Sequence, residues 1–507
     1  MSEARSTFWL AVTLTLVSAA SMALEIVAGR ALAPYVGMSL YTWTVIIAVV
    51  LAGLSLGHWF GGVIADRSHR PAAWVFAGLV SAGSTSALSL VILRWVEPLA
   101  AGSDPISHVG LLAVSAFFVP SLLAGLLSPV LTKMALDASQ PERHGRIIGR
   151  MFALGAAGAI LGTLVAGLVL ISWVGTTGSV ILITATYLML GLIFVRGAVG
   201  GAVLAVLMIF LGAGAIQQNS PLRAATCTVE SAYFCIRVDP LQMMGRSTRV
   251  MALDHLAHGV NDKDDPLLLL SPYVQGVDEL IRARGLSDPS AFFVGGGAFT
   301  LPRAWAARWP EARLTVAEID PEVTRLARER LWLAEPENLT AIHSDARVAL
   351  SSLPPEQRFD VIFGDAFHDI SVPKHLVTDE FHAEVADRLG PRGVYVMNVV
   401  DKLREPRFVL SLALTLGKRF DHVELWLDFE AIGPAEARTT WIVLASDTPT
   451  NLGELGSTYG PRRRWVQVPV SQMITAVGAD KLVSLTDDYA PVDRLLGDLL
   501  LSGDLLE

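Results

Sequence analysis

The sequence predicts a multi-pass α-helical membrane domain followed by an α/β domain that has a doubly wound sheet and a small β unit at its start. Residues 1–216 hold only 17 charged residues, whereas residues 217–507 hold 70. Long apolar runs fill the first stretch, and short apolar runs alternate with amphipathic segments from about residue 290. With 52% hydrophobic and 17% charged residues, the chain is too apolar to be disordered.

The first domain, which we place at residues 1–216, contains about seven candidate membrane spans. A spanning helix needs about 20 mostly apolar residues. Gly155, Ala159 and Gly162 recur at a spacing that suits close packing of one helix on another. The candidate runs are 8–29, 42–65, 72–93, 109–134, 151–170, 179–195 and 199–216.

Basic residues in the connections between these runs predict the orientation of the chain. One set of connections carries eight Lys or Arg residues, and the alternating set carries only Arg30 and Arg94. Because basic residues are enriched on the cytoplasmic side, we expect a protein of the cell (inner) membrane with a cytoplasmic N-terminus. After an odd number of spans, the second half of the chain would lie on the outer side.

Cysteine usage agrees with that orientation. The only two cysteines, Cys227 and Cys235, lie eight residues apart in a stretch that resembles a β-hairpin. A disulfide between them would persist only in an oxidising compartment. The alternative is a pair of buried thiols.

Two ionisable residues stand near the outer end of the first span, Glu25 and Arg30. Ionisable groups at such depth are costly and usually face a partner or a cavity. The alternative is an interfacial pair whose charged ends reach back to water.

The second half divides into a small β-hairpin unit at residues 217–264 and a larger α/β domain at residues 265–507. Alternation of strands with the amphipathic segments PRAWAARW, PEVTRLARERL and DEFHAEVADRL predicts a parallel sheet with helices on both faces. This half carries 29 basic and 41 acidic residues, a net charge of −12, which disfavours nucleic acid as a partner. The predicted strands are 291–295, 313–318, 340–343, 359–364, 393–398, 423–428 and 440–445.

A glycine turn follows the first of these strands. Gly295, Gly296 and Gly297 let the backbone approach a ligand closely, and Glu318 at the end of the next strand can hold both hydroxyls of a ribose. The run continues with Ala298 and lacks the further glycine of a dinucleotide site. The pattern therefore favours an adenosine that carries a sulfonium over one that carries a pyrophosphate.

Acidic residues follow the third and fourth strands, where ligands bind in open parallel sheets. Asp345 precedes Ala346, and Asp365 begins a segment that also contains Asp369 and His375. Carboxylates beside a cationic sulfonium would hold an amine and accept its proton as the nitrogen attacks carbon. A metal site and a solvated loop are the alternatives, and we expect no metal because the ligand spacing of a helix-borne site is missing.

Together these motifs resemble a known family. VGGG, AEIDPEV, HSDAR, FDVIFGDAFHD, LVTDEFH and GPRGVYVMN are similar to motifs of the spermidine synthase (polyamine aminopropyltransferase) family over most of residues 225–400. LDHLAHGVNDKDDP resembles the family's substrate-facing entry segment. The whole chain is similar to membrane-fused spermidine synthase-like proteins, through LEIVAGRALAPYVG, SLYTWTVIIAVVLAGLSLGHWFGG and LTDDYAPVD.

The resemblance implies a Rossmann-like (methyltransferase-like) domain and a role for each motif residue. The co-substrate would be decarboxylated S-adenosylmethionine or S-adenosylmethionine itself, with no prosthetic group. Asp365 would be the catalytic carboxylate that orients and deprotonates the amine. The donor would be bound by Gly295, Gly296, Gly297, Glu318 at the ribose, and Asp345 and Ala346 at the adenine. The acceptor would be bound by His258, Asp369 and Tyr273.

The sequence departs from the family pattern at three places. Ala298 stands where soluble members carry an aspartate, Asp365 and Asp369 are one residue further apart than in the family, and His258 replaces a glutamine. The leading hypothesis is a membrane-bound enzyme that transfers an aminopropyl group to a small amine such as putrescine. The alternatives are an S-adenosylmethionine-dependent transferase with a membrane-proximal acceptor, and a non-catalytic transporter or sensor that binds a polyamine or nucleoside. We expect a lipid bilayer as a partner and leave a homodimer open.

Overall fold

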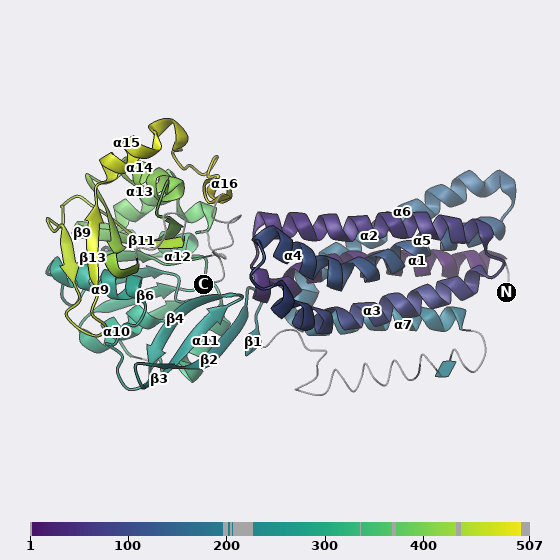
Figure 1. Ribbon diagram of the computed structural model, residues 1–507, viewed down its shortest axis with the longest axis horizontal. Coiled ribbons are helices and arrows are strands. Elements are labelled where there is room, and N and C mark those ends of the chain that lie inside the picture. The colour runs from purple at the N-terminus through teal and green to yellow at the C-terminus, as the bar shows by residue number, and fades with distance from the viewer. Residues whose placement is uncertain are drawn as a thin grey trace. The chain divides into compact units, whose positions relative to one another are not determined.

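The computed structural model describes residues 3–195, 201, 202, 205, 227–334, 336–367, 372–431 and 438–497. The chain forms two compact units, Met1–Cys235 and Ile236–Glu507. The first unit is helical and the second contains the large sheet (Figure 1). The three-part division at residues 216 and 264 remains a proposal, in which the small β unit is set apart from the larger domain.

The first unit is a bundle of long apolar helices (Figure 1). Glycines let the helices approach closely at two places: a side chain at Gly57 would meet the Leu122 carbonyl oxygen at 2.1 Å, and one at Gly162 would meet that of Ala19 at 2.1 Å. The small-residue pattern of residues 155–162 therefore lies at the contact between the helix that contains it, α6 (His144–Val165), and α1 (Glu3–Val36), as expected. The helices are α1 (Glu3–Val36), α2 (Leu40–Arg67), α3 (Pro71–Ala100), α4 (Pro105–Ala113), η1 (Val114–Phe118), α5 (Val119–Asp137), η2 (Pro141–Arg143), α6 (His144–Val165), η3 (Ala166–Val174) and α7 (Gly175–Phe194).

Five helical stretches of the described residues are long and apolar enough to cross a membrane. The sequence predicts about seven, and two features account for the difference. The expected span at 199–216 lies almost entirely outside the described residues. The expected spans 151–170 and 179–195 fall in one continuous stretch, Pro141–Phe194. Its 54 residues would extend roughly 80 Å as one straight helix, but Gly175 interrupts it with φ +74°.

The end of the first unit is tied to its helices. Cys227 and Cys235 form a disulfide that brackets the short strand β1 (Val229–Glu230), which confirms the pairing. The backbone N–H of Thr176, at the start of α7, donates to Glu230 at 2.6 Å. The Arg30 guanidinium, near the end of α1, donates to the carbonyl oxygens of Ser231 and Tyr233. Residues 230–233 therefore meet the C-terminal part of α1 and the N-terminal end of α7.

The second unit begins with an antiparallel meander of three strands. These are β2 (Cys235–Met243), β3 (Arg246–Leu253) and β4 (Leu256–Asp262). Asn261, buried at the end of β4, donates from its amide to the carbonyl oxygens of Ala298 and Leu331. The small β unit thus packs on the start of the α/β domain, beside the glycine turn.

The large sheet has nine strands in the order β12-β13-β10-β11-β9-β8-β5-β6-β7. Its parallel part runs from β7 to β9, with β5 at the centre. The strands are β5 (Ser290–Val294), β6 (Arg313–Ala317), β7 (Leu339–Ile342), β8 (Phe359–Gly364), β9 (Leu389–Lys402), β10 (His422–Asp428), β11 (Arg438–Ser446), β12 (Glu454–Gly456) and β13 (Arg464–Val468).

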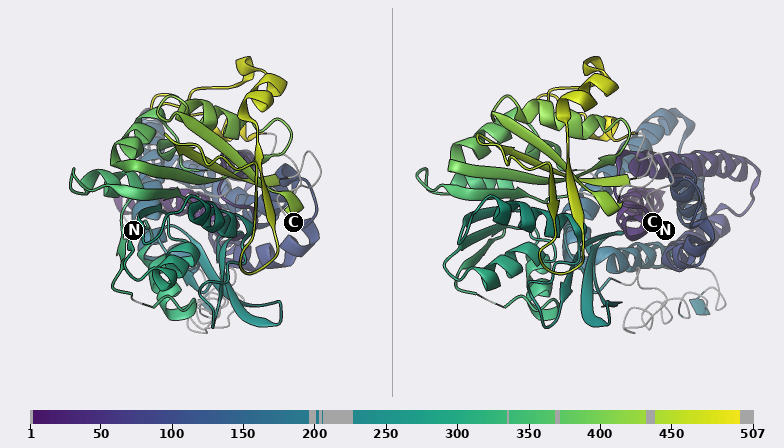
Figure 2. Two further views of the ribbon diagram at one scale, coloured as in Figure 1. Left: turned by 90° about the vertical axis from the view of Figure 1, so that its left-hand side faces the viewer. Right: turned by 60° about the vertical axis from the view of Figure 1, so that its left-hand side comes forward.

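Helices lie on both faces of this sheet (Figure 2). α10 and α11 follow β5 and β6, as the sequence predicts. The helices of the second unit are α9 (Pro272–Ala283), α10 (Thr300–Arg308), α11 (Pro321–Arg330), α12 (Ala346–Ser352), α13 (Asp379–Arg388), α14 (Arg407–Leu416), α15 (Val470–Val477) and α16 (Val492–Leu495), with short turns η4 (Lys374–Leu376), η5 (Phe429–Ala431) and η6 (Ala479–Lys481).

The expectation of a wholly parallel sheet is wrong at one end. β11 pairs antiparallel with both β9 and β10, and β13 pairs antiparallel with β10. The reason lies in the connections, because a parallel pair needs a crossover of a dozen or more residues. Only residues 429–437 separate β10 from β11, too few for a crossover helix.

Candidate active site

The glycine turn follows β5, and its hydrogen bonds link the carboxyl end of β5 to that of β6. The backbone N–H groups of Gly296 and Gly297 donate to Glu318 Oε2 at 2.8 and 3.3 Å, and that of Asp320 donates to Oε1 at 2.9 Å. Glu318 is only 5% exposed, and this burial raises the pKa of its carboxyl while the backbone hydrogen bonds oppose the rise. Glu318 therefore fixes the turn and remains at the sheet edge where the sequence places a ribose ligand.

Asp365 follows β8 and lies against the same turn. A side chain at Gly295, whose φ is +96°, would meet the Asp365 carbonyl oxygen at 2.8 Å, so only glycine permits this approach. The Tyr273 hydroxyl donates to Asp365 Oδ2 at 3.1 Å, and the Asn398 amide donates to Oδ1 at 2.9 Å. Burial raises the pKa of Asp365 to about 7, against the opposing effect of these two hydrogen bonds.

The Asp365 and Tyr273 side chains line a small hollow that is partly open to solvent. Its polar lining comes from β4, α9, the glycine turn and the end of β8, while its apolar wall comes mainly from α9, α10 and the central strands. Burial lowers the pKa of His258 to about 4, so this imidazole is neutral at neutral pH. The lining residues are His258, Tyr273, Val274, Phe293, Gly295, Gly296, Thr300, Leu301, Pro302, Phe363 and Asp365.

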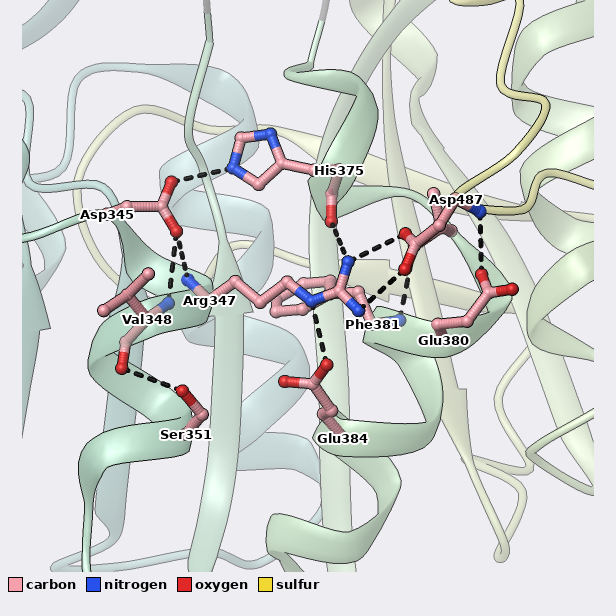
Figure 3. Close-up of polar contacts among 10 residues, drawn as sticks. Asp345, Arg347, Val348, Ser351, His375, Glu380, Phe381, Glu384 and Asp487 are labelled. Carbon is pink, nitrogen blue, oxygen red and sulfur yellow. Dashed lines mark hydrogen bonds and ion pairs between the residues drawn. The ribbon is translucent and has the colours of Figure 1, made fainter.

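Asp345 caps helix α12 (Figure 3), whereas Asp365 lines the hollow. Asp345 Oδ1 accepts from the backbone N–H groups of Arg347 and Val348, while His375 Nε2 lies 2.7 Å from Asp345 Oδ2. The Arg347 guanidinium makes a bidentate contact with Asp487, at 2.8 and 3.0 Å, which ties the C-terminal segment to this corner. Asp345 and Ala346 do not line the hollow.

The predicted site residues thus fall into three groups. His258, Tyr273, Gly295, Gly296 and Asp365 meet around one hollow. Gly297 and Glu318 adjoin it through the hydrogen bonds of the turn, and Asp345 with Ala346 begin the neighbouring helix α12. Asp369, the third predicted acceptor residue, lies outside the described residues.

Sequence reasoning missed Asn398 as part of this site. Asn398 lies within β9 and is 5% exposed. The available signal was a single amide in the otherwise apolar run VYVMNVV. Such a residue needs a hydrogen-bond partner when it is buried, and here the partner is Asp365.

Ala298 is one of the residues at which the sequence departs from the pattern of soluble spermidine synthases. Its side chain is 1% exposed, and a Cβ placed on Gly259 of β4 would come within 2.6 Å of the Ala298 Cβ. Position 298 is therefore turned into the packing between the glycine turn and β4.

Part of the chain matches curated proteins in sequence. It is 37% identical over 107 residues to a polyamine aminopropyltransferase of Vibrio vulnificus, which covers 21% of this chain and 36% of that protein. It is 33% identical over 124 residues to a probable polyamine aminopropyl transferase of Bifidobacterium longum, which covers 24% of this chain and 27% of that protein. Over these residues, the sequence is similar to polyamine aminopropyltransferases. The match spans about a third of the length of these relatives, and no family model matches the chain.

Two solved structures align with part of the chain. A probable spermidine synthase from Corynebacterium glutamicum aligns at 23% identity and a TM-score of 0.44, covering 50% of this chain and 94% of that chain. The spermidine synthase from Thermotoga maritima aligns at 18% identity and a TM-score of 0.32, covering 42% and 70%.

Proposed function

We propose that this chain is a membrane-bound aminopropyltransferase-like enzyme. It would transfer an aminopropyl group from decarboxylated S-adenosylmethionine to a small amine such as putrescine. The observation that carries the proposal is Asp365, a carboxylate in a hollow beside the glycine turn, whose burial raises its pKa to about 7. The similarity to curated polyamine aminopropyltransferases supports the reaction class.

The proposed transfer is a single substitution at carbon, in which the protein would accept one proton. The neutral amine nitrogen would attack the carbon next to the sulfonium, the new C–N bond would form as the C–S bond breaks, and methylthioadenosine would leave as a neutral thioether. The nitrogen loses one proton in this step. Asp365 would accept that proton, and a base is most effective when its pKa lies near the working pH.

Two neighbours would hold Asp365 in position for this role. The Tyr273 hydroxyl and the Asn398 amide each donate to a different oxygen of its carboxylate, which fixes the plane of the group. His258, neutral because burial lowers its pKa to about 4, would offer a hydrogen bond to the acceptor without repelling its charge. The ribose of the donor would lie at Glu318.

The first unit would cross the membrane, with a cytoplasmic N-terminus and the second unit on the outer side. Five apolar helical stretches, the eight-to-two distribution of basic residues and the disulfide between Cys227 and Cys235 support this placement. Maleimide labelling of intact cells, before and after reduction with an impermeant thiol, tests it. We expect labelling only after reduction. Labelling without reduction would contradict the disulfide, and labelling only after cell lysis would overturn the orientation.

Product analysis tests the reaction. Purified full-length protein given decarboxylated S-adenosylmethionine and putrescine should release methylthioadenosine. The Asp365→Asn variant should lower this rate by about 10²- to 10⁴-fold while donor binding persists. Asp360→Asn, a change at an exposed carboxylate of the same strand, is the matched control. Donor binding without methylthioadenosine in the wild-type protein would contradict the proposal.

Position 298 favours a second candidate, an S-adenosylmethionine-dependent transferase with a membrane-proximal acceptor. The buried Ala298 offers no carboxylate to an aminopropyl ammonium group. The same assay with S-adenosylmethionine separates the two candidates, because methyl transfer would yield S-adenosylhomocysteine and not methylthioadenosine.

A further inference from the structure

Of the buried polar atoms of the helical unit that have no hydrogen-bond partner among the described residues, three lie on α1 and α7. They are Glu25 Oε2 on α1, and Thr184 Oγ1 and the Tyr187 hydroxyl on α7. The three residues are 7%, 1% and 0% exposed. Buried polar groups without a partner are rare and commonly mark an ion or water that completes the site.

The contacts of α1 and α7 bring these three atoms to one level of the bundle. Arg30 near the end of α1 and Thr176 at the start of α7 both bond to residues 230–233, so the two helices run antiparallel. The Tyr187 hydroxyl lies beside the Ser21 side chain of α1.

The helix rise then places Glu25 opposite Thr184. From Ser21, Glu25 lies four residues toward the C-terminus of α1, which is about 6 Å along the axis. From Tyr187, Thr184 lies three residues toward the N-terminus of α7, which is about 4.5 Å in the same direction. Residues four and three apart share one face of a helix, so Glu25, Thr184 and Tyr187 belong to one cluster between α1 and α7.

The charge of this cluster is not balanced by its surroundings. No ion pair within the described part of the chain includes Glu25. Arg30, the nearest basic residue on α1, is engaged by the carbonyl oxygens of Ser231 and Tyr233. A carboxylate in an apolar bundle is costly unless a cation pairs with it or a proton neutralises it.

We propose that Glu25, Thr184 and Tyr187 form a binding site for a small monovalent cation within the helical unit. The donor set consists of oxygen atoms only, which suits hard cations. One carboxylate supplies one negative charge, so a monovalent cation leaves the site neutral, whereas a divalent cation would leave a net charge in the apolar core. This site is separate from the hollow around Asp365 and does not depend on the transfer reaction.

Direct ion binding tests the proposal on the purified full-length protein. Binding of radioactive sodium and of radioactive rubidium, as a tracer for potassium, is measured at constant ionic strength in choline chloride, and ammonium chloride is added as a competitor. We expect one saturable class of site per chain for at least one of the three ions. Glu25→Gln should weaken the affinity by about tenfold or more. Thr184→Val and Tyr187→Phe should each weaken it by about three- to tenfold.

Ser89→Ala is the matched control. Ser89 is also fully buried in the bundle, but its hydroxyl donates to the Ser86 carbonyl oxygen at 2.8 Å, so this variant should bind as the wild-type protein does. Glu25→Gln removes only a charge, so in choline chloride it should melt at the wild-type temperature or above, which shows that it folds. Absence of saturable binding in the wild-type protein, or unchanged affinity in Glu25→Gln, would overturn the proposal. The first outcome would mean that Glu25 carries only a proton.

Discussion

Replacing Asp365 by asparagine should stabilise the protein above neutral pH while it removes activity. Burial raises the pKa of Asp365 from 3.8 to about 7, so the folded protein holds a proton that the unfolded chain releases. The sign follows from linkage: a raised pKa contributes stability that is present at low pH and is lost as the pH rises toward 7. At about 1.4 kcal/mol per pH unit, the cost of the ionised carboxylate above pH 7 is at most roughly 4 kcal/mol.

The expected gain is smaller than this upper limit. An asparagine at 365 keeps one oxygen to accept from the Asn398 amide and can donate to the Tyr273 hydroxyl, but both hydrogen bonds lose a charged acceptor. We therefore expect a gain of about 1–3 kcal/mol at pH 8. The gain should be roughly 2–3 kcal/mol smaller at pH 5, because the cost of the raised pKa grows with pH between 3.8 and about 7.

Thermal unfolding of the full-length protein in detergent, followed by tryptophan fluorescence at both pH values, measures this effect. For a unit of this size, the gain corresponds to a rise in Tm of about 2–6 °C at pH 8. Asp360→Asn, at an exposed position of the same strand, controls for the loss of a charge as such. A destabilised Asp365→Asn variant at pH 8, or a difference that does not change with pH, would refute the view that desolvation governs this carboxyl.

Three further predictions concern other predicted site residues. Tyr273→Phe removes a hydrogen bond that lowers the pKa of Asp365, so the acidic limb of the pH profile of kcat/KM should move to higher pH, and an unmoved limb would exclude this contact. Gly295→Ala should lower the Tm by about 4 °C or more because alanine is strained at φ +96° and would overlap the Asp365 carbonyl, whereas Gly453→Ala, at an open exposed site, should not. Asp345→Ala should cost about 1 kcal/mol of stability through loss of the α12 cap, measured by thermal unfolding, whereas Asp345→Asn should keep the cap; equal losses in both would contradict the capping role.

Local patterns in the sequence predicted most of the α/β domain. The strands β5 to β11 lie within a few residues of the predicted runs, because each is a short apolar segment bounded by turn residues. Strand direction was harder to predict: the apolar run of β11 is as continuous as that of a parallel strand, because both faces of the sheet are covered there. The short strands β12 and β13 have no such run and were missed.

The candidate site was predictable where chemistry follows directly from position. Gly295, Glu318 and Asp365 each stand at the carboxyl end of a strand, so topology alone brings them to one edge. Asn398 could not be assigned in this way, because its contact with Asp365 depends on the register between β8 and β9. A register is set by packing across the sheet and is not visible in the sequence of one strand.

Among the described residues, Asp365 alone contributes a carboxylate to the hollow, and this has consequences for how the proposed reaction would be ordered. Free of ligand, Asp365 is poised between its two protonation states at neutral pH because burial opposes its charge. A cationic sulfonium beside it would favour the ionised form, since a nearby positive charge lowers the pKa of a carboxyl. The proposed donor would therefore convert Asp365 into a base before the amine arrives, and the same burial that destabilises the empty site would strengthen its attraction for the donor.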